Sequence, residues 1–272
     1  MSALHEQYAL GRSPREYARL ARQAEILKPM TRRLFAEAGI EPGMRVVDLG
    51  SGAGDICILL AEIVGSGGSV IGLDIDEDAL AHARERVSAT GVSNVTFVHS
   101  DFAHYVPDAT VDAIVGRLVL MYQKDPAAAL TKLTQHLRPG GVVAFLEPWF
   151  QSPSGPDSTT KIVITCIVET LRRSGAHVDL GPRLHRVFLA AGLPLPNMRF
   201  EIVVDPREES PLYDYIADTV AQLLPKAIEY GIPGAEGLDV SSIAGRMRTE
   251  MNAVGYAMMG SPLVSAWCSK TP

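Results

Sequence analysis

The stretch VVDLGSGAGD, residues 46–55, decides the fold class of this chain. It joins a β-branched apolar run to three alternating glycines and then to an apolar segment with helical spacing. A buried strand that runs through a glycine turn into a helix is typical of the first crossover of an α/β sheet. The glycines let backbone amides come close to a ligand at this turn. The stretch therefore predicts both a sheet and a place where a ligand binds.

The following hundred residues repeat this order of apolar run, turn and helical stretch. Five strands are expected, at residues 44–50, 68–74, 94–101, 111–117 and 140–147. Helices are expected between them at 53–64, 77–90 and 126–137. Strands that alternate with helices pair in parallel through right-handed crossovers. We therefore predict an α/β fold with a doubly wound, Rossmann-like sheet.

Beyond residue 147 the sequence predicts more helix than strand. Further helices are expected at 159–174, 182–191, 211–230 and 240–254, and further strands at 197–204 and 261–268. Four parts follow from this: an N-terminal helical lid at 1–40, an α/β core at 41–205, a helical insertion over the active site at 206–258 and a closing strand of the core at 259–272. The insertion is much longer than a usual connection, so we expect it to cover something.

An amphipathic helix is expected to start at Pro14, because apolar residues recur there at helical spacing. Pro29 is expected to break or restart this helix. Residues 1–33 also hold seven lysine and arginine residues against three glutamates, whereas the whole chain has a net charge of -6.

Composition excludes several function classes. The chain lacks the basic excess of a protein that binds nucleic acid through its phosphates. Its three cysteines are far apart and have no Cys-x-x-Cys spacing, so neither a disulfide framework nor a zinc site is indicated. No apolar run approaches the roughly 18 residues that span a bilayer, and the first residues lack the order of a secretory signal. We expect a cytoplasmic protein without metal, nucleic-acid or membrane partners.

The glycine spacing discriminates between two classes of cofactor. A dinucleotide fingerprint would place its third glycine at position 55, but this chain has Asp55 there and its third glycine at Gly54. A carboxylate in the first helical turn would repel a pyrophosphate, whereas Asp48 and Asp55 suit a ligand with an ammonium or a sulfonium. Asp74, 24 residues after Gly50, is placed to accept both hydroxyls of an adenosine ribose. The pattern therefore favours S-adenosylmethionine over NAD(P).

In these motifs the chain resembles the class I S-adenosylmethionine-dependent methyltransferases, particularly the small-molecule group that includes the ubiquinone and menaquinone biosynthesis C-methyltransferases. The matching text is VVDLGSGAGD, VIGLDIDEDAL, VTFVHSDF and the block from VDAIVGRLVLMY to LRPGGVVAFLEP, so residues 45–148 are covered well. The resemblance implies a seven-stranded sheet whose last strand is antiparallel.

The resemblance also implies a role for individual residues. The glycine loop would hold the methionine portion, the acid that ends the second strand would bind the ribose, and the acid after the third strand would meet the adenine amino group. The residue past the fourth strand, Arg117 or Leu118, would line the methionine end, although arginine is unusual there. The expected cofactor-binding residues are Asp48, Gly50, Ser51, Gly52, Asp74, Ile75, Ser100, Asp101, Phe102 and Arg117.

Each of these assignments has a structural alternative. The glycines could make only a tight turn, and Asp74 or Asp76 could cap the helix that follows. Asp101 could be a solvated turn residue. Arg117 could form an ion pair with Glu147 or Asp112.

No catalytic residue is predicted. Methyl transfer from a sulfonium mainly requires alignment of the acceptor and exclusion of water, and a general base is needed only if the acceptor must lose a proton. The candidates are His104, Tyr105, Tyr122, Glu147, Tyr8, Tyr17 and His185. None stands out by spacing, and an oxygen, nitrogen or carbon acceptor stays open.

The acceptor itself is expected to be an apolar or aromatic small molecule, because the insertion is rich in such residues. They are Tyr213, Tyr215, Leu223, Leu224, Met247, Met251, Tyr256, Met258 and Met259, which could equally form the insertion's own core. If Arg12 or one of the helical arginines turns inward, the acceptor would carry a carboxylate or phosphate.

Two other functions stay open from the sequence: an NAD(P)-dependent oxidoreductase on the same fold, and a protein that binds S-adenosylmethionine without methyl transfer. A base-modifying methyltransferase is disfavoured, because no Asn/Asp-Pro-Pro-aromatic string follows the fourth strand. A homodimer is a possible assembly.

Overall fold

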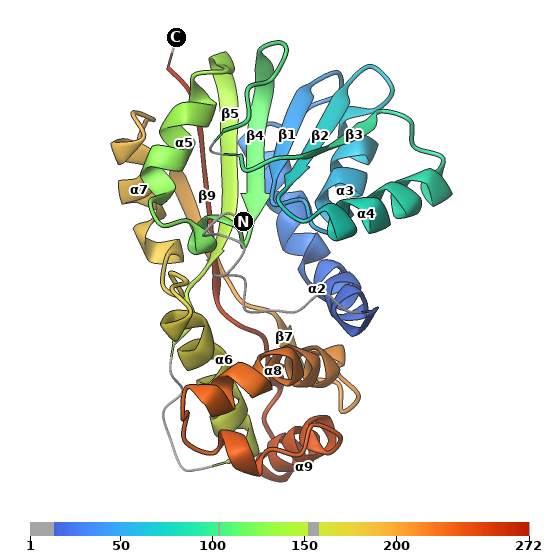
Figure 1. Ribbon diagram of the computed structural model, residues 1–272, viewed down its shortest axis with the longest axis vertical. Coiled ribbons are helices and arrows are strands. Elements are labelled where there is room, and N and C mark those ends of the chain that lie inside the picture. Colours follow the sequence, from blue (N-terminus) through green and yellow to red (C-terminus); the bar gives the residue numbers. More distant parts are fainter. Residues whose placement is uncertain (1–13, 103, 152–157, 272) are drawn as a thin grey trace. The chain divides into compact units, whose positions relative to one another are not determined.

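The computed structural model describes residues 14–102, 104–151 and 158–271, and the chain divides into two units (Figure 1). The α/β unit comprises Lys28–Pro148, Leu180–Glu201 and Leu263–Pro272. The helical unit comprises Met1–Leu27, Trp149–Asp179 and Ile202–Pro262. Each unit is described by itself below.

The α/β unit is built on a seven-stranded sheet in the order β3-β2-β1-β4-β5-β9-β6. Its strands are β1 (Arg45–Leu49), β2 (Ser69–Asp74), β3 (Val95–His99), β4 (Val111–Arg117), β5 (Leu137–Pro148), β6 (Asn197–Glu201) and β9 (Leu263–Ser269). Strand β9 runs antiparallel to both of its neighbours, β5 and β6, whereas the pairs among β1 to β5 are parallel. The predicted α/β sheet with an antiparallel last strand is confirmed.

Helices flank this sheet in the predicted order. They are α3 (Asp55–Val64), α4 (Glu77–Thr90), α5 (Pro126–Thr134) and α7 (Leu184–Ala190), with the short 3-10 helices η1 (Leu120–Tyr122) and η2 (Gly181–Arg183). Helix α3 packs against β1 and β2, and α4 packs against β2 and β3. The central strands are buried almost throughout, as expected of parallel strands covered on both faces.

Helix α2 (Pro14–Ala38) runs through Pro29 without interruption, so the predicted break at this proline is wrong. A proline inside a helix removes one backbone hydrogen bond and crowds the preceding turn. Here the turns that follow bury Met30, Leu34 and Phe35, each at most 5% exposed, and this packing stabilises the continuous helix.

The helical unit has a core of its own, formed by α6 (Thr159–Arg173), α8 (Pro211–Glu229) and α9 (Ile243–Val254). A 3-10 helix, η3 (Ala235–Gly237), and a two-stranded ribbon of β7 (Val204–Asp205) and β8 (Met258–Met259) complete it. The sequence boundaries placed 149–179 in the α/β core, but these residues group with the helical unit, because α6 packs on α8 and α9. The lid role of residues 1–40 and 206–258 stays a prediction.

None of the helices in the described part of the chain has the length and apolar character needed to cross a membrane.

The glycine turn after β1 uses three left-handed backbone conformations, with φ of +62° at Gly50, +49° at Gly52 and +82° at Gly54. Glycine adopts these without steric cost. A Cβ at Gly50 would overlap the side chain of Val119, whereas a Cβ at Gly52 would meet no atom within 4 Å. Gly50 is therefore required by packing as well as by backbone conformation, and the space beside Gly52 is open.

Replacing these two glycines by alanine separates the two effects. Gly52→Ala should lower the free energy of unfolding by about 1–2 kcal/mol, from the left-handed backbone alone. Gly50→Ala should lose a further 1–3 kcal/mol or so, because it also overpacks against Val119. Urea denaturation of both variants checks this expectation, and equal losses would show that Val119 does not constrain the turn.

Candidate functional site

The carboxyl ends of β1, β2, β4 and β5 hold most of the predicted site, at the lower end of these strands in Figure 1. The strand order reverses between β1 and β4, since β2 and β3 lie on one side of β1 and β4 and β5 on the other. Open α/β sheets bind ligands outside the carboxyl ends of the strands at such a reversal. Asp48, Asp74, Arg117 and Glu147 all lie on these strand ends.

Asp74 joins the end of β2 to the glycine turn. Its Oδ2 accepts a hydrogen bond of 2.8 Å from the backbone N–H of Gly52, and its Oδ1 accepts one of 2.9 Å from that of Asp76. Burial raises the pKa of Asp74, and the two backbone donors oppose this shift. Because a carboxylate oxygen has two acceptor positions, Asp74 is held in place and can still accept hydroxyl groups.

The structural alternative for Asp74 does not hold. Asp76 caps helix α4 instead, since its Oδ1 accepts from the backbone N–H groups of Asp78 at 3.0 Å and Ala79 at 3.2 Å.

Asp48 is completely buried on β1 beside the glycine turn. Its Oδ2 accepts the thiol hydrogen of Cys57 at 3.2 Å, and its Oδ1 has no hydrogen-bond partner within the described ranges. Burial raises the pKa of Asp48 to about 7, the Cys57 thiol and Arg117 lower it, and Asp74 raises it. A buried acid of this kind is stabilised in its ionised form only by a further donor or cation.

Ser51 supplies a second buried oxygen at the same turn. Its backbone N–H donates to the carbonyl of Leu73 at 2.9 Å, which ties the turn to β2. Its Oγ is buried and, like Asp48 Oδ1, has no partner in the part of the chain that the structure describes. Two orphaned oxygens beside the open position at Gly52 fit a ligand that brings its own hydrogen-bond donors.

Asp55 does not present the free charge on which the sequence argument relied. Its Oδ1 forms an ion pair of 2.6 Å with Arg86 on α4, and Arg86 also donates to the carbonyl of Ala53 at 2.6 Å. The repulsion expected between Asp55 and a pyrophosphate is therefore offset by Arg86. Sequence reasoning missed Arg86, because nothing in the local pattern of α4 links it to the glycine turn.

Arg117 ends β4 and donates to Thr31 Oγ1 on α2 at 3.1 Å. The expected structural partners have other contacts. Asp112 accepts from Arg138 at 2.6 Å, and Glu147 accepts from three backbone N–H groups. The positive charge of Arg117 also acts on Asp48, so a cation and a buried acid lie close together at the strand reversal.

The residues predicted for the adenine side come together at the ends of β2 and β3. The Ser100 N–H donates to the Asp74 carbonyl at 2.9 Å, and Ser100 Oγ donates to the Asp101 carbonyl at 3.1 Å. Phe102 is buried beside them, and the carbonyl of Ile75 lies 3.0 Å from His99 Nε2. Only the arrangement is observed here; the contacts with adenine stay predictions.

No general base emerges from the candidates. Both oxygens of Glu147 accept backbone hydrogen bonds, His185 Nδ1 lies 3.0 Å from the Pro182 carbonyl, and the exposed His104 lies 3.5 Å from Asp101. Burial raises the pKa of the Tyr105 hydroxyl, so this hydroxyl stays protonated at neutral pH and is poorly suited to act as a general base. Tyr8 lies outside the described residues.

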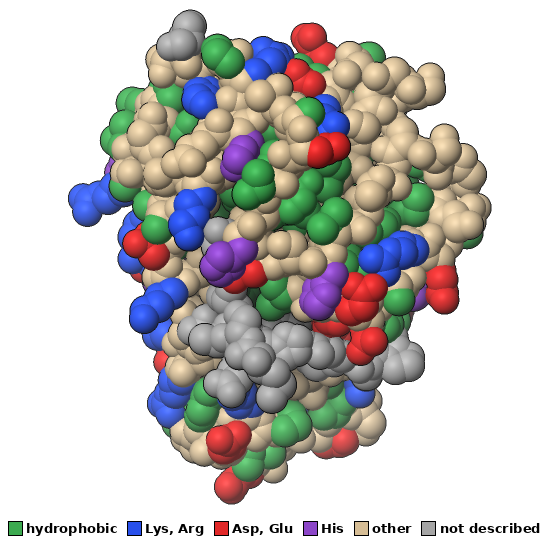
Figure 2. Space-filling model, turned by 45° about the horizontal axis from the view of Figure 1, so that its top comes forward, with side chains coloured by type: hydrophobic (Ala, Val, Ile, Leu, Met, Phe, Trp, Pro, Cys, Tyr) green, Lys and Arg blue, Asp and Glu red, His purple; other side chains and the backbone are tan. Residues whose placement is uncertain are grey.

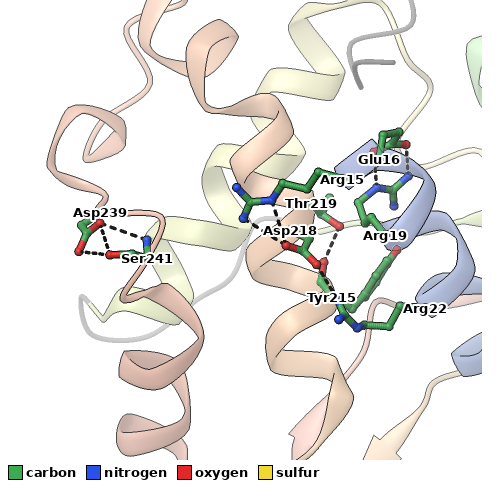
Figure 3. A network of polar contacts seen from close by, with 9 residues as sticks. All are labelled: Arg15, Glu16, Arg19, Arg22, Tyr215, Asp218, Thr219, Asp239 and Ser241. Atoms are coloured by element: carbon green, nitrogen blue, oxygen red, sulfur yellow. Dashed lines mark hydrogen bonds and ion pairs between the residues drawn. The ribbon is translucent and has the colours of Figure 1, made fainter. Parts of the chain in front are cut away.

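Three arginines in the first half of α2, Arg15, Arg19 and Arg22, are paired within the helical unit (Figure 3). Arg15 and Arg22 both contact Asp218 on α8. Arg19 binds Glu16 through two hydrogen bonds of 2.7 and 2.6 Å, with both side chains only 2% exposed. Their charge is thus matched by acids of the same unit, which removes the basis for an anionic acceptor held by these arginines. Arg12 lies outside the described residues.

Several apolar residues of the insertion belong to the core of the helical unit. Tyr213, Leu223 and Met247 are each at most 1% exposed. Of the nine residues considered, Tyr256 and Met259 are exposed. The insertion's composition is therefore explained largely by its own packing.

The three cysteines are buried and free, and burial raises the pKa of each, that of Cys268 to about 11. Among the described residues no group of three or more His, Cys, Asp or Glu side chains could hold a metal ion.

On the described part of the face drawn in Figure 2, basic and acidic side chains are interspersed.

Comparison with known proteins decides the family. A family model described as a methyltransferase domain matches residues 40–173. Aklanonic acid methyltransferase DauC from Streptomyces sp. (strain C5) is 30% identical over 167 residues, which cover 60% of this chain and 75% of that protein. The chain belongs to the S-adenosylmethionine-dependent methyltransferases. The resemblance stated from the sequence motifs is confirmed.

One further relative supports this methyltransferase assignment, and one solved structure shows the same fold. Demethylmenaquinone methyltransferase from Staphylococcus aureus (strain MRSA252) is 34% identical over 122 residues, which are 44% of this chain and 49% of that protein. A phosphoethanolamine N-methyltransferase of Haemonchus contortus, solved with S-adenosylhomocysteine, has the same fold, with a TM-score of 0.55 and 16% identity over 90% of this chain and 52% of that chain.

The matched segment spans a limited part of most curated relatives, between 32% and 63% of their length for those other than DauC. The methyltransferase family model ends at residue 173, so it includes the whole strand-end site of β1 to β5. The residues of that site fit S-adenosylmethionine. Asp74 is a carboxylate held by two backbone N–H groups with acceptor positions to spare, and Asp48 Oδ1 and Ser51 Oγ have no partner among the described residues.

The raised pKa of Asp48 predicts a specific dependence of stability on pH. The folded methyltransferase keeps the Asp48 proton up to about pH 7, whereas the unfolded chain loses it near pH 4. Between these values the folded state binds more protons, so this residue's contribution to stability falls as pH rises, by at most about 1.4 kcal/mol per pH unit.

Asp48→Asn removes this titration and keeps an oxygen for the Cys57 thiol. Relative to the variant, the unaltered protein should lose free energy of unfolding between pH 5 and pH 7. Urea denaturation at several pH values measures the difference. A difference that stays constant over this range would contradict the burial of an ionisable Asp48.

Proposed function

We propose that this chain transfers the methyl group of S-adenosylmethionine to a small molecule by in-line displacement. The observation that carries the proposal is the strand reversal at β1 and β4, where the fixed carboxylate of Asp74, the open Gly52 and the buried Asp48 lie beside one turn. The family assignment and the fit of this site to an adenosyl ligand support it.

The adenosine half is proposed to bind at the ends of β2 and β3. Asp74 accepts the two ribose hydroxyls through the positions left free by its backbone bonds. Ile75 and Phe102 lie beside the adenine ring, and Asp101 accepts its amino group. Ser100 fixes the spacing of Asp74 and Asp101, because it is bonded to the backbone of both.

The amino-acid half is proposed to bind between the ends of β1 and β4. This half carries an ammonium and a carboxylate, so its site needs an acidic side chain and a basic side chain close together. Asp48 and Arg117 supply this pair, and the charge of Arg117 lowers the pKa of Asp48. A charged partner for the orphaned Oδ1 of Asp48 offsets the cost of burying that carboxylate.

The cofactor supplies an activated methyl group on a sulfonium. The chain's own residues hold it in line with an acceptor and exclude water, and such positioning can lower the barrier by roughly 7–11 kcal/mol. The acceptor is proposed to be an apolar or aromatic metabolite. The names of two relatives, which refer to aklanonic acid and demethylmenaquinone, support a small organic acceptor.

The direct test is transfer of a labelled methyl group to a panel of phenolic and quinol compounds, followed by mass spectrometry. We expect labelled product and S-adenosylhomocysteine to form together, and only when an acceptor is present. Binding of the donor without transfer to any compound of the panel would favour a binding protein without methyl transfer.

Asp74→Asn tests the ribose site. The change removes a charged acceptor and turns an amide donor toward the N–H of Gly52 or Asp76, so the Kd for S-adenosylhomocysteine should rise about 10- to 100-fold. Asp76→Asn is the matched control, because it loses the same charge two residues away and asparagine caps a helix equally well. Calorimetry of both variants decides, and an unchanged Kd for Asp74→Asn would refute the role of Asp74.

Arg117→Gln tests the amino-acid site. The Kd for S-adenosylhomocysteine should rise about tenfold, because a charged contact to its carboxylate is lost, while the Kd for 5′-methylthioadenosine, which lacks the amino-acid group, should stay the same. Arg138→Gln is the control, since Arg138 pairs with Asp112 and lies at the start of β5. Equally weakened binding of both ligands would show that Arg117 does not contact the amino-acid half.

A further inference from the structure

Glu147 lies near the end of β5 and is completely buried. Its Oε1 accepts hydrogen bonds from the backbone N–H groups of Val119 at 3.0 Å and Leu120 at 2.8 Å. Its Oε2 accepts one from Met121 at 3.2 Å. One side chain thus satisfies three successive donors at the start of the 3-10 helix η1, which have no partners inside that helix.

The turn that Glu147 holds is strained. Leu118, between β4 and η1, has φ of +53° and is the one non-glycine residue with positive φ among those the structure describes. This conformation is sterically unfavourable for a residue with a Cβ, so it persists only where neighbouring contacts enforce it. The N–H of Leu118 donates to the carbonyl of Leu146 at 2.9 Å, which holds the turn against β5 next to Glu147.

The same turn packs on the glycine loop. The side chain of Val119 fills the space where a Cβ of Gly50 would lie, and a Cβ at Gly116 would be 2.7 Å from Val119 Cγ1. Val119 is therefore held on one side by β4 and on the other by Gly50. Its backbone position is set by Glu147, so Glu147, Val119 and Gly50 form a continuous set of contacts from β5 to β1.

We propose that Glu147 is a positioning residue for cofactor binding, which fixes the turn 118–121 and, through Val119, the conformation of the loop Gly50–Gly52. This inference rests on the proposed function. In this proposal Glu147 acts on the ligand through the turn that it holds, and not as a ligand contact or a general base. Burial raises the pKa of Glu147 to about 7, and its three backbone donors oppose this shift.

The strand order predicts which half of the ligand is affected. With the ribose on β2 and the adenine toward β3, the amino-acid half lies toward β1 and β4, where the turn held by Glu147 is. A disturbed turn should therefore weaken the binding of S-adenosylhomocysteine and leave the binding of 5′-methylthioadenosine nearly unchanged.

Glu147→Gln tests the proposal with little change in shape. A glutamine oxygen can serve Val119 and Leu120, but its amide group opposes the N–H of Met121. The Kd for S-adenosylhomocysteine should rise at least about tenfold, and that for 5′-methylthioadenosine should change less than about twofold. Hydrogen exchange in the ligand-free protein should become faster over residues 49–54.

Glu250→Gln is the matched control. Glu250 likewise accepts from two backbone N–H groups, Thr159 at 2.9 Å and Thr160 at 3.2 Å, at the start of a helix in the helical unit. Its replacement removes an equivalent contact at the start of a helix. The loss of free energy of unfolding is measured for both variants, so that an effect on ligand binding can be distinguished from a general loss of stability. Glu250→Gln should leave the Kd for S-adenosylhomocysteine and the exchange over 49–54 unchanged.

The outcomes separate this inference from the proposed function. If the unaltered protein binds no S-adenosylhomocysteine, the proposed function fails, and the exchange over 49–54 still decides whether Glu147 fixes the loop. Unchanged exchange in Glu147→Gln, or equal weakening of both ligands, would overturn the inference. Should Glu147→Gln not fold, Val119→Ala keeps the backbone hydrogen bonds and removes the contact with Gly50; the same selective loss is expected, and its absence would count against the proposal.

Discussion

The site depends on two carboxylates that are buried away from water and therefore need hydrogen-bond donors or a cation. They are Asp48 on β1 and Glu147 on β5. A buried carboxylate is costly unless other groups bind it. Glu147 obtains three backbone donors, which fixes the turn after β4. Asp48 obtains one thiol and the nearby charge of Arg117, and one of its oxygens stays without a partner among the described residues. Glu147 is therefore suited to a structural role, and Asp48 is suited to a ligand cation.

The remaining contacts transmit this constraint across the strand reversal. Val119, placed by Glu147, packs on Gly50, and the same loop is tied to β2 through the bond between Asp74 and Gly52. Arg86 adds a tie from α4 through Asp55 and Ala53. The glycine loop is thus held by contacts from three neighbouring elements, and a loop fixed by the chain itself loses less conformational entropy when a ligand binds.

The fold could be predicted because its signals are local. Apolar β-branched runs, glycine turns and helical periodicity each lie within one element, and all the strands of the sheet were expected. The misses depend on partners distant in sequence. Burial of Phe35 stabilises a continuous α2 through Pro29, and Arg86 pairs with Asp55. Residues 149–179 belong to the helical unit because α6 packs on α8 and α9. The local sequence of α6 does not indicate these packing partners.

The central claim is that this strand reversal is built for an adenosyl cation and not for a dinucleotide. The most direct measurement is calorimetric titration of the unaltered protein with S-adenosylhomocysteine and, in parallel, with NADH. The account predicts saturable binding of one S-adenosylhomocysteine per chain and no binding of NADH. Saturable binding of NADH, with none of S-adenosylhomocysteine, would contradict it.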